Sequence, residues 1–166
     1  RKWKQYDEAT AKMAEIVRKY GLSGTSIRQK LERHLGVKRV QVKGEHFTAI
    51  NNDCILELKN MESDSVGLIH TSIPFSNHYE YTATYNDFGH NPDTEHFFEQ
   101  MDYLTPEEYR VLKPGRMMAI HVKDRVLFGN ATGTGMPTIE PFHALCIKHY
   151  MDHGFQYCGM ITVVTD

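Results

Sequence analysis

The feature that most constrains the fold of this chain is an apolar run that ends in a polar turn containing proline. The run Val66–Ile69 leads directly into Thr71–Phe75, which reads Thr-Ser-Ile-Pro-Phe. An uninterrupted apolar run is typical of a strand buried on both faces of a parallel sheet, and proline ends a strand because it lacks a backbone donor. Ligands of open α/β sheets lie at the carboxyl ends of strands, which makes Thr71–Phe75 a candidate site. Taken alone, the pentapeptide favours the simpler interpretation of a strand that stops at its proline.

The residues after this run predict a helix and a second parallel strand. One helix is expected to open near residue 93. A second is expected to start at Thr105, where threonine can cap, proline suits the first turn and Glu108 completes a capping box. Pro114-Gly115 then turns the chain into an apolar strand, Met117–Val122. Strand, helix and strand in this order predict a parallel crossover, so the predicted fold class is α/β.

Further elements are expected on both sides of this unit. Phe47–Asn51 predicts a short strand, and the residues after Asp53 predict a short helix that its carboxylate could cap. Pro141–His153 predicts a helix that Gly154 ends, and Phe155–Val164 predicts a final strand.

The charge is divided unevenly, which predicts a basic helical arm over residues 1–44 and an acidic body over residues 45–166. Residues 1–45 hold 12 Lys and Arg against 5 Asp and Glu, whereas residues 46–166 hold 7 against 16. Such an arm either meets phosphate or is a solvated helix surface. Residues 37–45 are interpreted as a basic connector.

Apolar residues at helical spacing predict two helices in the arm, which end at Gly21 and Gly36. The first helix has a heptad seam that could form a homodimer. Arg28, Lys30 and Arg33 of the second helix could face DNA, as in a helix-turn-helix, although a helical hairpin packed on its neighbour ranks first.

Cysteine, hydropathy and histidine patterns exclude several other classes. The three cysteines are odd in number and far apart, which argues against a disulfide scaffold and favours a reducing, cytoplasmic location. No apolar run reaches about 18 residues, so no membrane partner is expected. His149 and His153 lie one helical turn apart, but no third ligand is near them in the sequence, so no metal site is expected.

Three stretches, in order, resemble a known enzyme family. Thr71–Phe75 resembles motif IV of the DNA amino-methyltransferases, (Asp/Asn/Ser)-Pro-Pro-(Tyr/Phe/Trp), although Ile73 stands where the family has its first proline. Phe47–Leu58 resembles the segment that precedes motif IV when the motif order is permuted, and Tyr109–Val122 resembles the helix end and strand that follow it. The match covers roughly residues 45–166 and implies a partial, mostly parallel Rossmann-like methyltransferase sheet behind an N-terminal helical hairpin.

The resemblance implies S-adenosylmethionine-dependent methylation of an exocyclic amino group in DNA, at cytosine N4 or adenine N6, after base flipping. The Ser72 side chain and the Ile73 carbonyl would accept hydrogen bonds from the amine, Pro74 would hold the turn and Phe75 would stack on the base. A serine-led motif leans towards cytosine. Asp53 would accept a hydrogen bond from the adenine amino group of the cofactor.

The resemblance also bears on DNA contacts and on the extent of the chain. The loop Ser76–Pro92 carries aromatic residues, Tyr79 and Tyr81 among them, that could stack on bases or pack onto the sheet. The glycine-rich segment 129–135 lacks the ending of a P-loop and is interpreted as a mobile loop near the DNA groove. The family's Phe-x-Gly-x-Gly cofactor loop is not found. We therefore expect a piece of a longer protein, of the bacterial or phage restriction-modification type, that binds the cofactor weakly on its own.

Two other functions remain open at this point. The chain could be a non-catalytic DNA-binding or assembly module in which the basic arm is the active part. It could also methylate RNA or a protein glutamine, which related motifs serve.

Overall fold

The computed structural model describes residues 38–81 and 86–164 of the chain. The two helices expected in the N-terminal arm, with Arg28, Lys30 and Arg33, lie outside the described residues, and so does the dimer expected from the first of them. Within the described ranges, no helix combines the length and the apolar character needed to cross a membrane.

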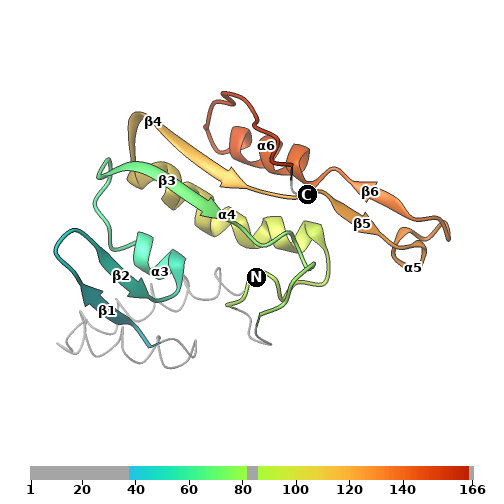
Figure 1. The fold of residues 1–166 in the computed structure, drawn as a ribbon, viewed down its shortest axis with the longest axis horizontal. Coiled ribbons are helices and arrows are strands. Elements are labelled where there is room, and N and C mark those ends of the chain that lie inside the picture. The colour runs from blue at the N-terminus through green and yellow to red at the C-terminus, as the bar shows by residue number, and fades with distance from the viewer. Residues whose placement is uncertain (1–37, 82–85, 165–166) are drawn as a thin grey trace, which may run out of the picture.

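The centre of the fold is one strand–helix–strand unit (Figure 1). Strand β3 (Val66–Ser72) leads through the loop to helix α4 (Thr94–Val111), and strand β4 (Leu112–His121) returns beside β3 in parallel. The parallel crossover predicted from the sequence is therefore confirmed, and the chain has the predicted α/β class.

The described strands form three separate two-stranded sheets instead of one mostly parallel sheet. Only the pair β3–β4 is parallel, whereas β1–β2 and β5–β6 are antiparallel hairpins. The parallel pair needs a long crossover because its strands run the same way, and α4 provides it. The other two pairs are joined locally.

The turn expected at Pro114-Gly115 is present as an irregularity inside β4. Val66 pairs with Leu112, but Leu68 already pairs with Met117, so the residues between Leu112 and Met117 bulge out of the ladder. Gly115 has φ +70°, a left-handed conformation that glycine adopts without steric cost. The strand is therefore longer than predicted but contains the predicted turn.

One face of the β3–β4 pair is buried and the other is bare, so the expectation of a strand buried on both faces was wrong. Leu68 and Met117, which are register partners on the bare face, are 60% and 62% exposed. The opposite face of β4 packs Met118 and Ile120 against the core. Packed and exposed residues alternate along β4, because successive side chains of a strand point to opposite faces.

The core gathers apolar side chains from three helices, from the residue after β3 and from the loop that precedes α4. Its buried members are Ile55, Leu56, Ile73, Phe88, Phe97, Met101, Leu104, Phe142, Cys146 and Tyr150. Phe97 is fully buried and touches the rings of Phe88, Phe98 and Phe142 at edge-on or tilted angles. Aromatic packing therefore holds α4 against the C-terminal helix.

Helix α4 runs without a break through Thr105 and Pro106, so the helix restart predicted there was wrong. Proline removes one helical amide donor, the one that would bond the carbonyl of Asp102. Thr105 is fully buried, and its hydroxyl bonds His149 at 2.8 Å instead of capping a new helix. Tertiary contacts thus carry the helix past a residue that usually ends one.

The N-terminal side of the body is a hairpin followed by a capped helix. Strands β1 (Val40–Lys43) and β2 (Thr48–Asn51) pair antiparallel, so the expected connector is in fact a strand. Its Val-Gln-Val-Lys alternation was the signal for this, because a strand has a period of two. The strand and helix expected next are confirmed as β2 and α3 (Cys54–Leu58).

At the other end of the molecule, a second hairpin precedes the last helix (Figure 1). Strands β5 (Arg125–Leu127) and β6 (Thr138–Glu140) pair antiparallel around the short helix α5 (Gly129–Thr132). The expected C-terminal helix is confirmed as α6 (Phe142–Asp152).

The strand predicted over residues 155–164 is not formed, because no described strand pairs with this segment. A strand needs a neighbour to take its backbone hydrogen bonds, and the apolar side chains of Ile161 and Val164 are exposed.

This packing makes a direct prediction about two phenylalanines. Phe97→Ala should lower the free energy of unfolding by about 3–5 kcal/mol, because it empties a fully buried site. Phe128→Ala should change it by less than about 0.5 kcal/mol, because Phe128 is 69% exposed on the hairpin. Urea denaturation of both variants tests the assignment, and equal effects would contradict it.

Candidate active site

The carboxyl ends of the two parallel strands place a serine and a histidine side by side. Ser72 is the last residue of β3 and pairs in register with His121, the last residue of β4. The Ser72 Oγ lies 3.2 Å from His121 Nδ1, within hydrogen-bond distance. Sequence reasoning found Ser72 but missed His121, which could have been found by aligning the ends of the two predicted parallel strands.

The exposure of this pair follows from strand alternation. Ser72 and His121 lie on the same face as Leu68 and Met117, which is the bare face of the sheet. Both side chains are accordingly exposed to solvent. The hydroxyl therefore points away from the core, where a ligand can approach it.

The rest of the candidate motif anchors this tip to the core. Ile73 is buried in the hydrophobic core, whereas Pro74 and Phe75 are half-buried. The ring of Phe75 meets His121 edge-on at 6.0 Å and Phe142 at 6.4 Å between centroids. Isoleucine at position 73 thus contributes apolar burial at the place where the resembled motif has proline.

A buried polar cluster holds the chain immediately after the motif. Ser76 is fully buried in a left-handed conformation with φ 57°, and its Oγ accepts a hydrogen bond from Thr94 Oγ1 at 3.0 Å. Arg125 donates to Thr94 at 2.9 Å, to Glu140 at 3.1 Å and to Asn77. This cluster joins the motif loop, the start of α4 and the β5–β6 hairpin. Hydrogen bonds to Ser76 and Asn77 therefore anchor the chain directly after Phe75.

Asp53 is the N-cap of helix α3. Its Oδ1 accepts hydrogen bonds from the backbone amides of Ile55 at 3.0 Å and Leu56 at 3.2 Å, and its Oδ2 accepts one from Asn86 at 3.1 Å. The carboxylate is buried. The capping role considered in the sequence is thus present, and a cofactor role remains a proposal.

The aromatic residues of the loop Ser76–Pro92 differ in their exposure to solvent. Tyr79 and Tyr81 are exposed, whereas Phe88 of the same loop is buried against Phe97. One ring of this loop therefore packs against helix α4, while contact of Tyr79 and Tyr81 with bases remains a prediction. The glycine-rich segment forms the tip of the β5–β6 hairpin, where Thr132 Oγ1 donates hydrogen bonds to the carbonyls of Gly129 and Met136.

A second polar network lies inside the molecule, between α4 and α6. Tyr150 donates to Glu108 at 3.2 Å, and the side chain of Thr105 hydrogen-bonds both Tyr150 and His149. Burial raises the pKa of Glu108 to about 7, and burial lowers the pKa of His149 to about 4. At neutral pH, therefore, His149 is uncharged and Glu108 is divided between its two forms.

Comparison with known proteins finds a partial structural likeness. No protein-family model and no curated protein matches the chain. Among solved structures, it is similar to crystal structures of a "Putative DNA Modification Methylase" from Thermus thermophilus, one of them at 27% identity over 63% of this chain with a TM-score of 0.47. Another, complexed with S-adenosyl-L-methionine, is 23% identical over 68% of this chain with a TM-score of 0.48. The chain spans 39% and 46% of the lengths of those two chains.

The buried network predicts a specific dependence of stability on pH. Between pH 4.5 and about 7, folded Glu108 holds a proton that the unfolded chain has released. Its contribution to the free energy of unfolding should therefore fall as pH rises through this window, by up to about 3 kcal/mol. His149 acts in the opposite sense between about pH 4 and 6.5, so the contribution of Glu108 must be isolated by a variant.

Glu108→Gln provides that comparison, because glutamine keeps the shape and an acceptor for Tyr150 but does not titrate. The gain in stability of the variant over the wild type should be larger at pH 8 than at pH 5 in urea denaturation. Glu95→Gln, an exposed change on the same helix, is the control and should give no such trend. A constant difference between wild type and Glu108→Gln would show that Glu108 is not buried as described.

Proposed function

We propose that this chain is the catalytic part of a methyltransferase that transfers a methyl group from S-adenosylmethionine to an exocyclic amino group of a base in DNA, cytosine N4 or adenine N6. The observation that carries the proposal is the exposed pair of Ser72 and His121 at the ends of two parallel strands. The motif resemblance indicates the type of reaction, and Ser72 and His121 are side chains suited to that reaction.

The first requirement of this reaction is to make a poor nucleophile reactive. The lone pair of a base amine is delocalised into the ring, and acceptors for both N–H groups draw the nitrogen towards tetrahedral geometry. The Ser72 Oγ and the carbonyl of Ile73 are the two acceptors. They are effective because the sheet and the buried Ile73 side chain hold them in place before the base arrives.

His121 strengthens Ser72 as a hydrogen-bond acceptor and takes up the proton that is released when the amine is methylated. In the tautomer with a free Nδ1 lone pair, His121 accepts a hydrogen bond from the Ser72 hydroxyl. Both oxygen lone pairs of Ser72 can then face the amine. As the amine nitrogen bonds to the methyl carbon, its proton passes to Ser72 while the hydroxyl proton passes to His121. The electron pair of the broken carbon–sulfur bond stays on sulfur. His121 is exposed and returns its proton to water.

S-adenosylmethionine supplies a methyl group made electrophilic by its sulfonium sulfur. Asp53 fits the adenine end of this molecule, because a carboxylate offers about four acceptor positions and can take an amino group beside Asn86 or in its place. Pro74 holds the turn, and Phe75 stacks on the flipped base with one face of its ring. Tyr79 and Tyr81, exposed in the following loop, contact neighbouring bases of the DNA.

The direct test measures labelled methyl transfer to oligonucleotides in single-turnover conditions, with the protein in excess. Ser72→Ala should lower the rate on the order of 10²–10³-fold, because it removes a positioned acceptor. Ser65→Ala is the matched control: it makes the same change at an exposed serine that directly precedes β3, at the opposite end from Ser72, and should leave the rate unchanged. DNA binding should be equal in all three proteins.

His121→Ala tests the role of the histidine separately. The rate should fall on the order of 10²-fold or more, and added imidazole should restore part of it, because a free base can occupy the space left beside Ser72. Pre-methylated oligonucleotides identify the accepting base. Labelling of RNA or protein instead of DNA, or no labelling of DNA by the wild type, would overturn the proposal. Equal rates in the wild type and Ser72→Ala would do the same.

A further inference from the structure

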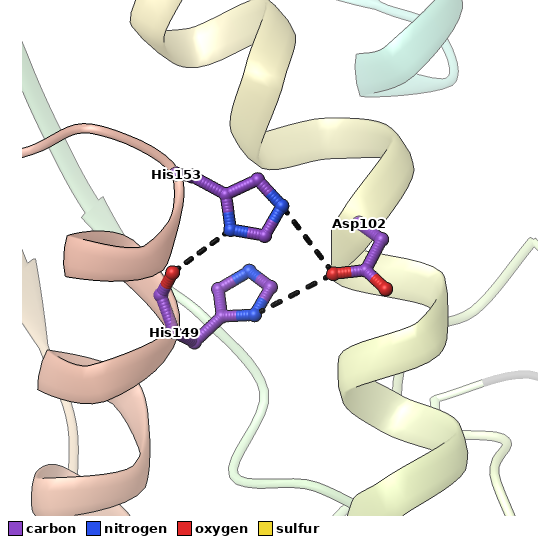
Figure 2. A group of neighbouring side chains, drawn as sticks. All are labelled: Asp102, His149 and His153. Carbon is purple, nitrogen blue, oxygen red and sulfur yellow. Dashed lines mark hydrogen bonds and ion pairs between the residues drawn. The ribbon is translucent and has the colours of Figure 1, made fainter.

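The packing of helix α6 on helix α4 brings three possible metal ligands together. Asp102 comes from α4, His149 comes from α6, and His153 is the C-cap residue of α6, four residues after His149 (Figure 2). The same Asp102 oxygen, Oδ1, lies 3.7 Å from His149 Nδ1 and 3.4 Å from His153 Nε2. All three ligand atoms lie within 4.8 Å of one another.

The hydrogen bonds around His149 determine which of its nitrogens carries the proton. The Tyr150 hydroxyl donates a hydrogen bond to Glu108, and the Thr105 hydroxyl hydrogen-bonds the Tyr150 oxygen. The Thr105 oxygen is then the acceptor for His149 Nε2–H, at 2.8 Å. His149 Nδ1 therefore has a free lone pair, and that lone pair faces Asp102.

The backbone determines the tautomer of His153. Its Nδ1 lies 2.8 Å from the carbonyl oxygen of His149, which can only accept, so Nδ1 carries the proton. Nε2 is then the nitrogen that faces Asp102 (Figure 2). In both histidines, the second ring nitrogen is engaged by an outer partner, as is usual for histidines that bind metals.

Three electron-rich atoms thus lie within 4.8 Å of one another: two imidazole nitrogens, each with a lone pair, and a carboxylate oxygen. Such atoms repel one another unless a positive charge lies between them. We propose that Asp102, His149 and His153 bind a Zn²⁺ ion, through the Nδ1 of His149, the Nε2 of His153 and a carboxylate oxygen of Asp102. Two nitrogens and one oxygen are a ligand set that zinc prefers, with a water molecule in the fourth position.

The carboxylate side of the group is open to solvent. The side chain of Asp102 is 56% exposed, whereas that of His149 is buried. An open depression of about 520 Å³ lies against Asp102 and is lined by His96, Glu99, Asp102 and Tyr103. The ion would therefore be reached from solvent on the carboxylate side and held from the core side.

The expectation that no metal binds rested on the lack of a third ligand near His149 and His153 in the sequence. Asp102 is 47 residues before His149, and only the packing of α4 on α6 brings it there. The ion would join α4 to the C-terminal end of α6 through side chains from both. Its expected role is to stabilise the helix pair.

The experiment titrates the full chain with Zn²⁺ in competition with a chromogenic chelator and records thermal unfolding with and without the ion. The wild type should bind one ion and unfold at a higher temperature when it is present. Asp102→Asn and His153→Gln, both on the accessible side, should each weaken binding at least about tenfold and lose the thermal shift. His143→Gln is the control, because His143 lies on the same helix as His149 but pairs with Asp124, which directly precedes β5.

Nitrogen-15 NMR of the histidine side chains identifies the liganding atoms. On adding Zn²⁺, the Nδ1 signal of His149 and the Nε2 signal of His153 should move, while those of His143 should not. Unchanged unfolding temperature and histidine spectra would overturn the proposal and leave a plain ion pair of protonated His153 with Asp102. Zinc binding that Asp102→Asn and His153→Gln leave intact would place the ion elsewhere and would also overturn it.

Discussion

The parallel pairing of β3 with β4 is the constraint on which the candidate active site depends. Because the two strands run in the same direction, both end at the same level, and the register sets Ser72 beside His121. A slip of one residue would exchange the faces of a strand, turning Ser72 towards the core and Ile73 towards solvent. The burial of Ile73 opposes that slip, so the residue that departs from the resembled motif also fixes the serine in place.

Helix α4 is held at both ends by buried polar groups, and this links the sheet to the rest of the molecule. At its start, Thr94 joins a cluster with Arg125 and Glu140, and near its end, Glu108 is bonded by Tyr150. Removing one partner of such a buried group leaves the other without compensation, which costs several kcal/mol. Polar contacts therefore define where α4 lies, while its aromatic residues supply most of the buried apolar surface.

Much of the fold could be predicted from local patterns, and the misses have physical causes. The carboxylate before α3, the apolar run of β3 and the glycine after α6 are local signals, and each predicted element is present. The helix break at Thr105 was predicted wrongly because the hydroxyl that could cap a helix instead reaches His149, a contact between residues 44 apart. The strand at residues 155–164 failed because strand formation needs a partner, and an apolar sequence alone does not supply one.

The sequence by itself determined the order of the α/β elements, the serine-led turn after the central strand and the chemistry that this turn resembles. These follow from patterns within a few residues of one another, where backbone preferences and side-chain spacing act directly. Only the tertiary structure decided that His121 stands beside Ser72, that Asp102 faces His149 and His153, and that one face of the sheet is bare. Each of these depends on the packing or register of elements far apart in the chain, which no local pattern specifies.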